Sequence, residues 1–370
     1  MNIRPFVPPM LPLDESEDRW GHFGMLDFYA TAALAQLNGM MLASAKADLF
    51  WLTWLLKEAQ SSNVIEGTVT TFDEILGENA GVVVPVERQD DVKEVVNYHK
   101  AMQAGLEEIA AGRPLTLSLV RALHALLLQG SRGEHKHPGQ WRKVQVHIGM
   151  PGSGMDEATF IPPEPVHVES LLENWEAFLH RNDMNPIIQA AVMHAQFEMI
   201  HPFCDGNGRM GRLLITLFLA EKKVISKPCF YMSAYLQAHR SEYYSALGNI
   251  SRLGDWHDWI SFFLKAVVER SQGNINLLDA MNRLYEVSKK DFSESTASST
   301  AVQILDYMFA KPVFTLPDIY HHFEKSMSRQ GIMNIINKLA QAGIVEKVSS
   351  GKGRVPAIWR FTELMKLLGE

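Results

Sequence analysis

The chain has 370 residues, of which 46% are hydrophobic and 21% charged, and its formal net charge is -7. This length predicts two or three domains, and the composition excludes a disordered or coiled-coil protein. The acidic balance gives no general attraction to nucleic acid. Two cysteines are too few for a disulfide framework, and no signal peptide or membrane-length apolar stretch is recognisable, so we expect a cytoplasmic protein with no membrane partner.

The chain begins with a helical pattern. Apolar residues recur at three- and four-residue spacing over 20–60, which predicts one long helix. A Gly-Val-Pro loop over 77–85 ends this part, so we expect an N-terminal helical region over 1–86. A mainly α core is expected over 87–288, with helices within 87–128 and at 166–180, 186–200, 208–222, 240–251 and 256–288.

One segment departs from the helical pattern. Residues 142–148 alternate polar and apolar, a Gly/Pro/Ser-rich turn follows, and 158–161 runs into Pro162-Pro163. Two successive prolines bar a central strand, so this pattern predicts a β-hairpin flap over 139–163.

The C-terminal part has the pattern of a separate module. Residues 289–298 are rich in Ser and Thr, which predicts a linker. The charge changes sign beyond it, because residues 297–370 carry a net +3 and the rest of the chain a net -10. A winged-helix domain is predicted over 299–370 from helices at 301–309, 316–323 and 329–342 and strands at 345–348 and 357–361.

The most informative segment runs from His201 to Arg212, between two apolar helical stretches. Gly206 and Gly208 flank Asn207 and allow a tight turn that points backbone N–H groups at an anion. The start of the following helix adds a partial positive charge. These features predict a phosphate-binding loop.

Four side chains of this segment suit nucleotide chemistry. Asp205 offers a hard oxygen ligand for Mg2+, which is usually held by one or two carboxylates and phosphates. Arg209 and Arg212 are three residues apart and are able to hold different phosphates. His201, as a neutral imidazole, is able to accept a proton from an attacking hydroxyl. A structural Asp-Gly-Asn-Gly turn is the competing interpretation, which the joint presence of all these residues disfavours.

The segment matches the pattern H-x-F-x-(D/E)-G-N-G-R-x-x-R without a departure, and on these residues the chain resembles the Fic-domain proteins. The similarity continues through the flap and through residues 231–256. It implies a Fic-type helical bundle that transfers AMP from ATP to a protein hydroxyl and releases pyrophosphate. The residues that it implies in nucleotide binding are Glu66, Gly206, Asn207, Gly208, Arg209, Met210, Gly211, Arg212 and Tyr243.

The resemblance also implies individual roles. His201 would be the general base for a Ser, Thr or Tyr hydroxyl, and Asp205 would hold Mg2+ against the α- and β-phosphates. The amides around Asn207 and Gly208 would neutralise charge on the α-phosphate, while the two arginines clamp the β- and γ-phosphates. Tyr243 would contact the nucleotide, although its helical position also fits a buried core aromatic.

Residues 62–67, Ser-Asn-Val-Ile-Glu-Gly, fit the (S/T)-x-x-x-E-(G/N) inhibitory motif of the same family. The resemblance implies an inhibitory helix at about 61–67, with Ser62 in it and Glu66 paired with Arg212 in the place of the γ-phosphate. A plain helix end with a solvated Glu66 is the alternative. The carboxylate is also able to orient a water that removes AMP from a modified target, and the sequence does not separate these roles.

The expected partners are ATP and a target protein whose hydroxyl docks on the flap, with self-modification included. The family often forms homodimers, which makes pairing of two copies a plausible expectation. The winged helix fits DNA binding or protein docking about equally, because its basic candidates are few: Arg329, Lys338, Lys352 and Arg354. A nucleotide-sensing DNA-binding transcription regulator is therefore the rival function. Transfer of another group, such as UMP or phosphocholine, is a third interpretation.

Overall fold

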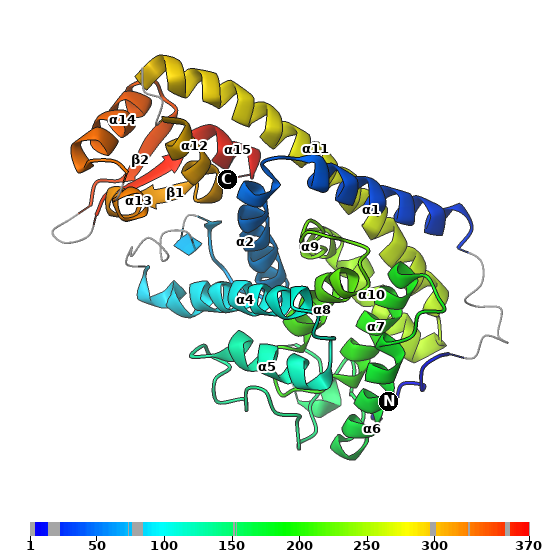
Figure 1. Ribbon diagram of the computed structural model, residues 1–370. Coiled ribbons are helices and arrows are strands. Elements are labelled where there is room, and N and C mark those ends of the chain that lie inside the picture. The colour runs from blue at the N-terminus through cyan, green and yellow to red at the C-terminus, as the bar shows by residue number, and fades with distance from the viewer. Residues whose placement is uncertain are drawn as a thin grey trace.

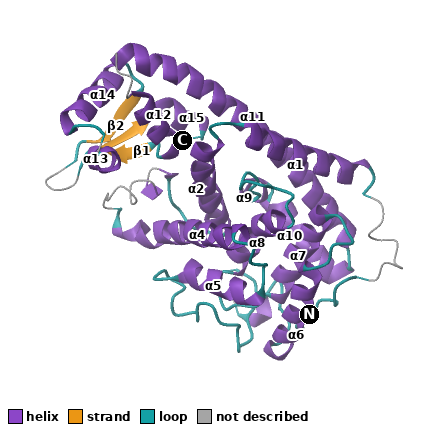
Figure 2. Cartoon of the chain, in the orientation of Figure 1, coloured by secondary structure: helices purple, strands orange, loops and turns teal. Residues whose placement is uncertain are grey.

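The computed structural model describes residues 4–13, 23–72, 74–75, 84–150, 152, 154–296, 301–324, 326–351 and 356–369 (Figure 1). It is mainly helical, as predicted, and the named strands all lie in the C-terminal part (Figure 2). None of the described helices is long and apolar enough to cross a membrane.

The N-terminal region forms two helices, α1 (Met25–Ala43) and α2 (Ala47–Ile65), where the sequence pattern predicted one. The break lies at Ser44, whose backbone is extended (ψ 116°) and whose hydroxyl donates to Asn282 Oδ1 at 3.3 Å. The break lets α1 lie along the long helix α11 (Trp256–Thr296) while α2 turns toward the centre of the molecule (Figure 1).

The core is a helical bundle built around one buried pair. Helices α7 (Pro186–Ile200) and α8 (Asn207–Glu221) pack against each other and are buried on nearly all sides, which explains why their sequences are apolar all round. Asn185 caps α7 by accepting from Ile187 N–H at 2.8 Å. The surrounding helices are α4 (Val86–Ala110), α5 (Leu117–Leu128), α6 (Pro165–Leu179), α9 (Ser233–Ala238), α10 (Arg240–Leu253) and α11.

The flap over 139–163 is present, with its two arms antiparallel but with less strand pairing than a regular β-hairpin has. The described residues of this segment contain one isolated antiparallel bridge, Ile148 to Phe160, and a short 3-10 turn over Met155–Glu157. Side chains occupy the carbonyls that strand pairing would use. Gln145 donates to Pro162 O at 2.9 Å, Arg142 donates to Pro163 O at 2.5 Å, and neither proline has an N–H to donate.

The described residues of the C-terminal module form four helices and a small antiparallel sheet. In chain order it contains α12 (Ala301–Ala310), β1 (Val313–Thr315), α13 (Leu316–Phe323), α14 (Arg329–Gln341), β2 (Val345–Ser349), β3 (Ile358–Phe361) and α15 (Thr362–Leu367), with strand order β1-β3-β2. The sequence did not predict β1 or α15, which are too short to show a period. Lys352 and Arg354 lie outside the described residues.

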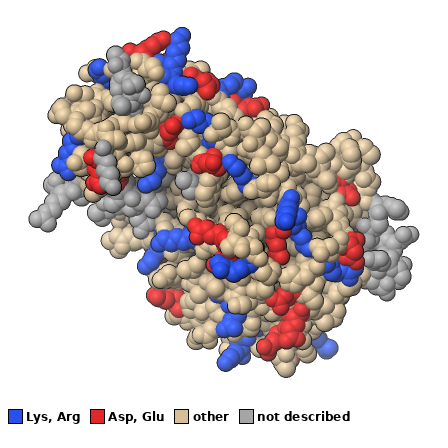
Figure 3. All heavy atoms as spheres, in the orientation of Figure 1, with Lys and Arg blue, Asp and Glu red and all other residues tan. Residues whose placement is uncertain are grey.

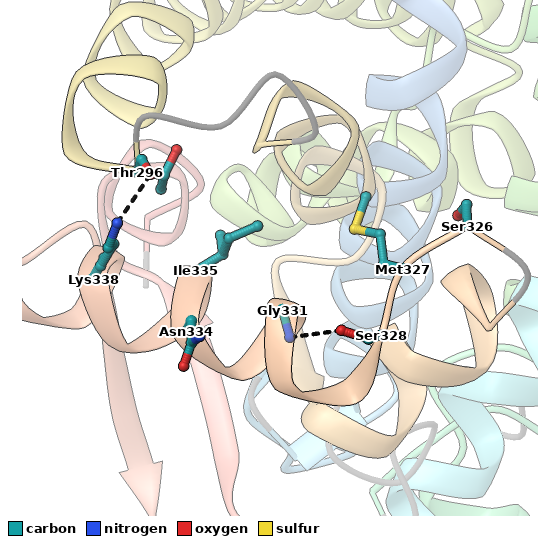
Figure 4. Close-up of a pocket in the computed structure, with 8 residues that line it drawn as sticks. All are labelled: Thr296, Ser326, Met327, Ser328, Gly331, Asn334, Ile335 and Lys338. Atoms are coloured by element: carbon teal, nitrogen blue, oxygen red, sulfur yellow. Dashed lines mark hydrogen bonds between the residues drawn. The ribbon is translucent and has the colours of Figure 1, made fainter.

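The linker predicted over 289–298 was wrong for residues 289–296, which continue α11 as helix. The helix continues because one of its faces is buried in the C-terminal module, where Phe292 is fully buried and its ring lies 6.1 Å from that of Phe361. Lys338 of α14 donates to Thr296 O at 3.0 Å, at the last residue of α11 (Figure 4). Residues 297 and 298 lie outside the described residues.

Candidate active site

The loop that joins α7 to α8 is closed by one side chain. Asn207 Oδ1 accepts from Phe203 N–H at 2.8 Å, and Asn207 Nδ2 donates to Phe203 O at 2.9 Å. Gly206 allows the turn because its φ is 77°, a region that residues with a side chain rarely adopt. Asn207 is therefore a clamp that fixes the loop.

The start of α8 offers free amides to an anion. The first hydrogen bond within this helix runs from Met210 N–H to Gly206 O, so the N–H groups of residues 207–209 have no acceptor inside α8. The partial positive charge of the helix start adds to their attraction. This is the cradle that the glycine pattern predicted.

His201 ends α7 in the left-handed conformation, with φ 49°. Its Nδ1 lies 3.3 Å from Glu198 O, and a carbonyl only accepts, so Nδ1 carries the proton and Nε2 is left as the basic nitrogen. Burial, together with the nearby Arg142 guanidinium, lowers the pKa of His201 to about 4. The imidazole is neutral at physiological pH and is able to accept a proton.

Arg142 joins the flap to this loop, and the sequence did not single it out. It is 3% exposed, and its guanidinium donates to His201 O at 2.8 Å, to Val144 O at 3.2 Å and to Pro163 O. These acceptors are all backbone carbonyls, so no local pattern of charges could have indicated the interaction. Burial lowers the pKa of Arg142.

His124 of α5 supports the loop from the other side and was also missed. Gly139 N–H donates to its Nδ1 at 2.9 Å, so Nε2 carries the proton and donates to Asp205 O at 2.9 Å. Its ring stacks on that of Phe203 with centroids 3.5 Å apart. Burial lowers the pKa of His124 to about 4, which keeps the ring neutral in this role.

Arg209 is buried and only partly satisfied. Its Nη1 lies 3.3 Å from Glu94 Oε2 and its Nη2 lies 3.5 Å from Asp205 Oδ1. The contact between Nη1 and Glu94 is an ion pair without the geometry of a hydrogen bond. The buried nitrogens Nε and Nη1 therefore have no hydrogen-bond partner among the described residues. Such orphaned donors are costly unless a ligand satisfies them, so this guanidinium fits a phosphate group.

The donor set fits Mg2+ only together with phosphates. The Asp205 side chain is 41% exposed, and one of its oxygens, Oδ1, accepts from Gly206 N–H at 2.6 Å. No group of three or more His, Cys, Asp or Glu that could hold a metal occurs among the described residues. One carboxylate with phosphate oxygens and waters is the usual environment of Mg2+ at nucleotide sites.

Arg212 is held by Ser62 and Glu66. Its Nη2 lies 2.6 Å from Glu66 Oε1 and also donates to Ser62 O at 2.9 Å, while its Nε donates to Ser62 Oγ at 2.9 Å. Arg212 is 2% exposed. Burial of Glu66 favours its neutral form, but the charge of Arg212 outweighs this and lowers the pKa of Glu66. Glu66, whose side chain is 36% exposed at the C-cap of α2, is therefore an ionised partner of Arg212, as the motif predicted.

A side chain at either of two glycines of α8 would displace a glutamate carboxylate. A Cβ at Gly208 would lie 2.4 Å from Glu66 Oε1, so the Glu66 carboxylate occupies the space beside this residue. A Cβ at Gly211 would lie 2.2 Å from Glu198 Oε1. Gly211 and the fully buried Met210 thus face the interior and not the cradle.

Tyr243 is a core residue, whereas its neighbour Tyr244 is partly exposed. Tyr243 is 1% exposed, and its hydroxyl lies 3.0 Å from His194 Nε2. Tyr244 is 45% exposed, and Arg240 lies over its ring at 5.7 Å.

Glu58 fixes α2 against the core and carries no signal in the sequence. This buried carboxyl accepts from Ser233 N–H at 3.0 Å, from Ser233 Oγ at 2.5 Å and from Tyr98 Oη at 3.1 Å. It lies one turn before Ser62 and two turns before Glu66, so all three side chains share one face of α2.

A helical bundle that presents a glycine loop, unpaired amides and two buried arginines at the start of one helix defines a class of phosphate-binding proteins. Comparison with known families narrows this class. The Fic/DOC family matches residues 114–219, and the N-terminal region of the Fic/DOC family matches residues 28–107. Together these matches cover half of the chain, which belongs to the Fic/DOC family.

Curated relatives carry related names. A probable protein adenylyltransferase of Aquifex aeolicus is 30% identical over 148 residues, which are 39% of this chain and 45% of the relative. The protein adenylyltransferase Fic of Drosophila ananassae is 29% identical over 136 residues, which are 35% of this chain and 24% of the relative. The chain therefore spans less than half the length of these relatives.

Solved structures share the fold. A Fic family protein from Desulfovibrio desulfuricans G20 superposes with a TM-score of 0.56 at 20% identity, covering 93% of this chain and 98% of that one. A Fic domain containing signaling protein from Bacteroides thetaiotaomicron has a TM-score of 0.55 at 18% identity and covers 69% of this chain and 97% of that one.

Proposed function

We propose that the protein is an adenylyltransferase that moves AMP from ATP to a Ser, Thr or Tyr hydroxyl of a target protein and of itself, and that Glu66 inhibits it. The observation that carries the proposal is the position of a neutral His201, with Nε2 free, beside an anion cradle whose Arg212 is held by Glu66. The names of the curated relatives support the reaction class.

In the proposed reaction, His201 Nε2 takes the proton of the attacking hydroxyl. The hydroxyl oxygen bonds to the α-phosphorus, the bond from that phosphorus to the bridging oxygen breaks, and pyrophosphate leaves. The amides of residues 207–209 stabilise the charge that grows on the α-phosphate, and Arg209 binds a terminal phosphate. Asp205 would hold Mg2+, which would supply positive charge against the negative charge of the phosphates.

The brake works by competition for one guanidinium. Arg212 makes three hydrogen bonds to Ser62 and Glu66 through Nε and Nη2. These donors are therefore not available to a phosphate while α2 holds this position. A γ-phosphate needs the same donors, and ATP then binds without its full set of contacts. The proposal includes a second role for Glu66: its carboxylate would direct a water toward a target that already carries AMP.

In this proposal, different parts of the chain contact the target protein and the ring of the nucleotide. The flap positions the target hydroxyl, because its edge has few internal backbone bonds and leaves N–H and C=O groups for an extended segment. Tyr244 would contact the nucleotide ring in place of Tyr243, because Tyr244 is exposed and Tyr243 is buried. The choice of adenine over uracil, and the pairing of two copies of the chain, stay predictions.

Intact-mass measurement after incubation with ATP and Mg2+ tests the proposal. Glu66→Gly should gain an AMP adduct faster than the wild type, because Arg212 becomes available to the γ-phosphate. The double variant with His201→Ala should show no adduct, with a loss of roughly 100-fold or more, while still binding ATP. No adduct in Glu66→Gly, with or without cell extract as a source of targets, would contradict the proposal.

A further inference from the structure

Helix α2 has two faces with different neighbours. Glu58, Ser62 and Glu66 follow one another at four-residue spacing and contact α4, α8 and α9 of the core. The first half of the same helix packs on α12, the first helix of the C-terminal module. Figure 1 shows α2 between the two units, with α12 at its upper end.

The contact between α2 and α12 is buried and partly polar. Thr53 is fully buried, and its hydroxyl donates to Phe309 O of α12 at 3.2 Å. The ring of Phe50 lies 5.5 Å from that of Phe309. A buried threonine hydroxyl without this acceptor would be left unsatisfied, so the bond is specific for the docked position of α12.

A charged contact closes the same interface. Lys46, just before α2, lies 3.0 Å from Asp306 Oδ1 of α12, and Tyr285 of α11 donates to the same oxygen at 2.5 Å. Phe309 also contacts the ring of Phe361 on β3 at 5.5 Å. The interface therefore joins the inhibitory helix to the sheet of the C-terminal module.

We propose that the C-terminal module regulates the brake by holding α2 through the Thr53–Phe309 contact, so that undocking α12 releases Glu66 from Arg212. The inference rests on the proposed function for its activity readout. It assigns to the C-terminal module a role that acts inside the chain.

Linkage gives the direction of the effect. The contacts between α2 and α12 are present when Glu66 is paired with Arg212. They therefore stabilise the paired state by the part of their free energy that is lost when α2 moves. Thr53 lies within α2, and Glu66 is the C-cap residue of the same helix, with no break between them. Displacement of the helix at Thr53 is therefore transmitted to Glu66. A buried hydrogen bond contributes about 1 kcal/mol, which corresponds to a change of roughly three- to tenfold in the released population.

The decisive variant is Thr53→Val, which removes the hydroxyl and keeps the volume. Its rate of AMP incorporation should rise three- to tenfold over the wild type, by the same roughly 1 kcal/mol, whereas in a Glu66→Gly background Thr53→Val should cause no further increase. Phe309→Leu should act in the same direction. Thr315→Val is the matched control: Thr315 is an equally buried threonine that caps α13 in the same module, away from α2.

Amide hydrogen exchange provides a readout that does not need the reaction. Exchange over residues 58–67 should accelerate in Thr53→Val and stay at the wild-type rate in Thr315→Val. If Glu66→Gly carries no AMP adduct, the proposed function fails, and the exchange result alone decides the inference. Unchanged exchange in Thr53→Val, or wild-type rates in both α2–α12 variants while Glu66→Gly is active, would overturn the regulation.

Discussion

Glu198 shows how strongly single residues of this site depend on burial. It lies one turn before His201 on α7, its Oε1 has no hydrogen-bond partner among the described residues, and it faces Gly211. Burial raises the pKa of Glu198 to about 8, so this carboxyl is largely neutral at physiological pH. A neutral Glu198 leaves Arg212 with Glu66 as its ionised partner.

The raised pKa predicts a pH dependence of stability. In the unfolded chain a Glu has a pKa of about 4.3. The stabilisation of the fold that the raised pKa of Glu198 represents is therefore complete below that pH and is lost as the pH rises through about 8. The buried histidines His124, His194 and His201, whose pKa values are lowered, act in the opposite direction. They reduce the free energy of unfolding as the pH falls below 6.5, the ordinary pKa of histidine. Between pH 6.5 and about 8 the free energy of unfolding of the wild type should therefore fall by up to about 1.4 kcal/mol per pH unit more than that of Glu198→Gln. Parallel urea-unfolding curves for the two proteins over this range would contradict the shift.

The motif residues could be predicted because they are adjacent in sequence, and their partners could not. His201, Asp205 and the two arginines fall within one 12-residue segment. Arg142, His124 and Glu58 reach the site through contacts 59, 81 and 175 residues apart in the chain, mostly with backbone groups that carry no sequence signal. The pairing of Glu66 with Arg212 was predictable only through family resemblance.

At the scale of elements, the described residues of the flap are held mainly by side chains, and their strand pairing is limited to one bridge. Periodicity indicated alternation over 142–148, but Arg142 and Gln145 bind the carbonyls of the opposite arm. The helices of the core were predicted closely because their apolar residues repeat over three or more turns. The break at Ser44 and the continuation of α11 were missed, because tertiary contacts with Asn282 and Phe361 decide them.

Arg142→Lys tests the role of the flap anchor. Lysine keeps the charge but cannot reach carbonyls of the flap and of the loop at once. In the Glu66→Gly background we expect kcat for AMP transfer to fall at least about tenfold, while KM for ATP changes less than about threefold. Arg121→Lys is the control, because Arg121 is exposed and contacts the base of the flap, where it donates to Gly139 O and lies over the ring of Trp141. Equal losses in the two variants would argue against a specific role of Arg142.

At the scale of the molecule, the distribution of charge disfavours DNA as the partner of the C-terminal module. Figure 3 shows Lys and Arg interspersed with Asp and Glu over the visible face. On α14, Arg329 lies over the ring of Tyr320 at 4.3 Å, and Lys338 is bound to Thr296 O. Both basic residues of this helix thus have partners within the chain.

We therefore expect weak DNA binding by the full chain. Fluorescence anisotropy with random and genomic duplexes should give little binding at physiological salt, and a shallow dependence of affinity on salt concentration. Lys352→Ala and Arg354→Ala should change it little. Tight binding with a steep salt dependence that these substitutions reduce would restore the transcription regulator as the better interpretation.

The unbroken α11 affects any attempt to dissect the protein. Its 41 residues span about 60 Å at 1.5 Å per residue, and they belong to the catalytic bundle at one end and to the C-terminal module at the other. A truncation after residue 288, where composition suggested a safe boundary, would sever this helix and expose the aromatic face that Phe50, Tyr285 and Phe309 now share. The shortened protein would be prone to aggregate, so the two units are better separated by point substitutions at their interface than by cutting the chain.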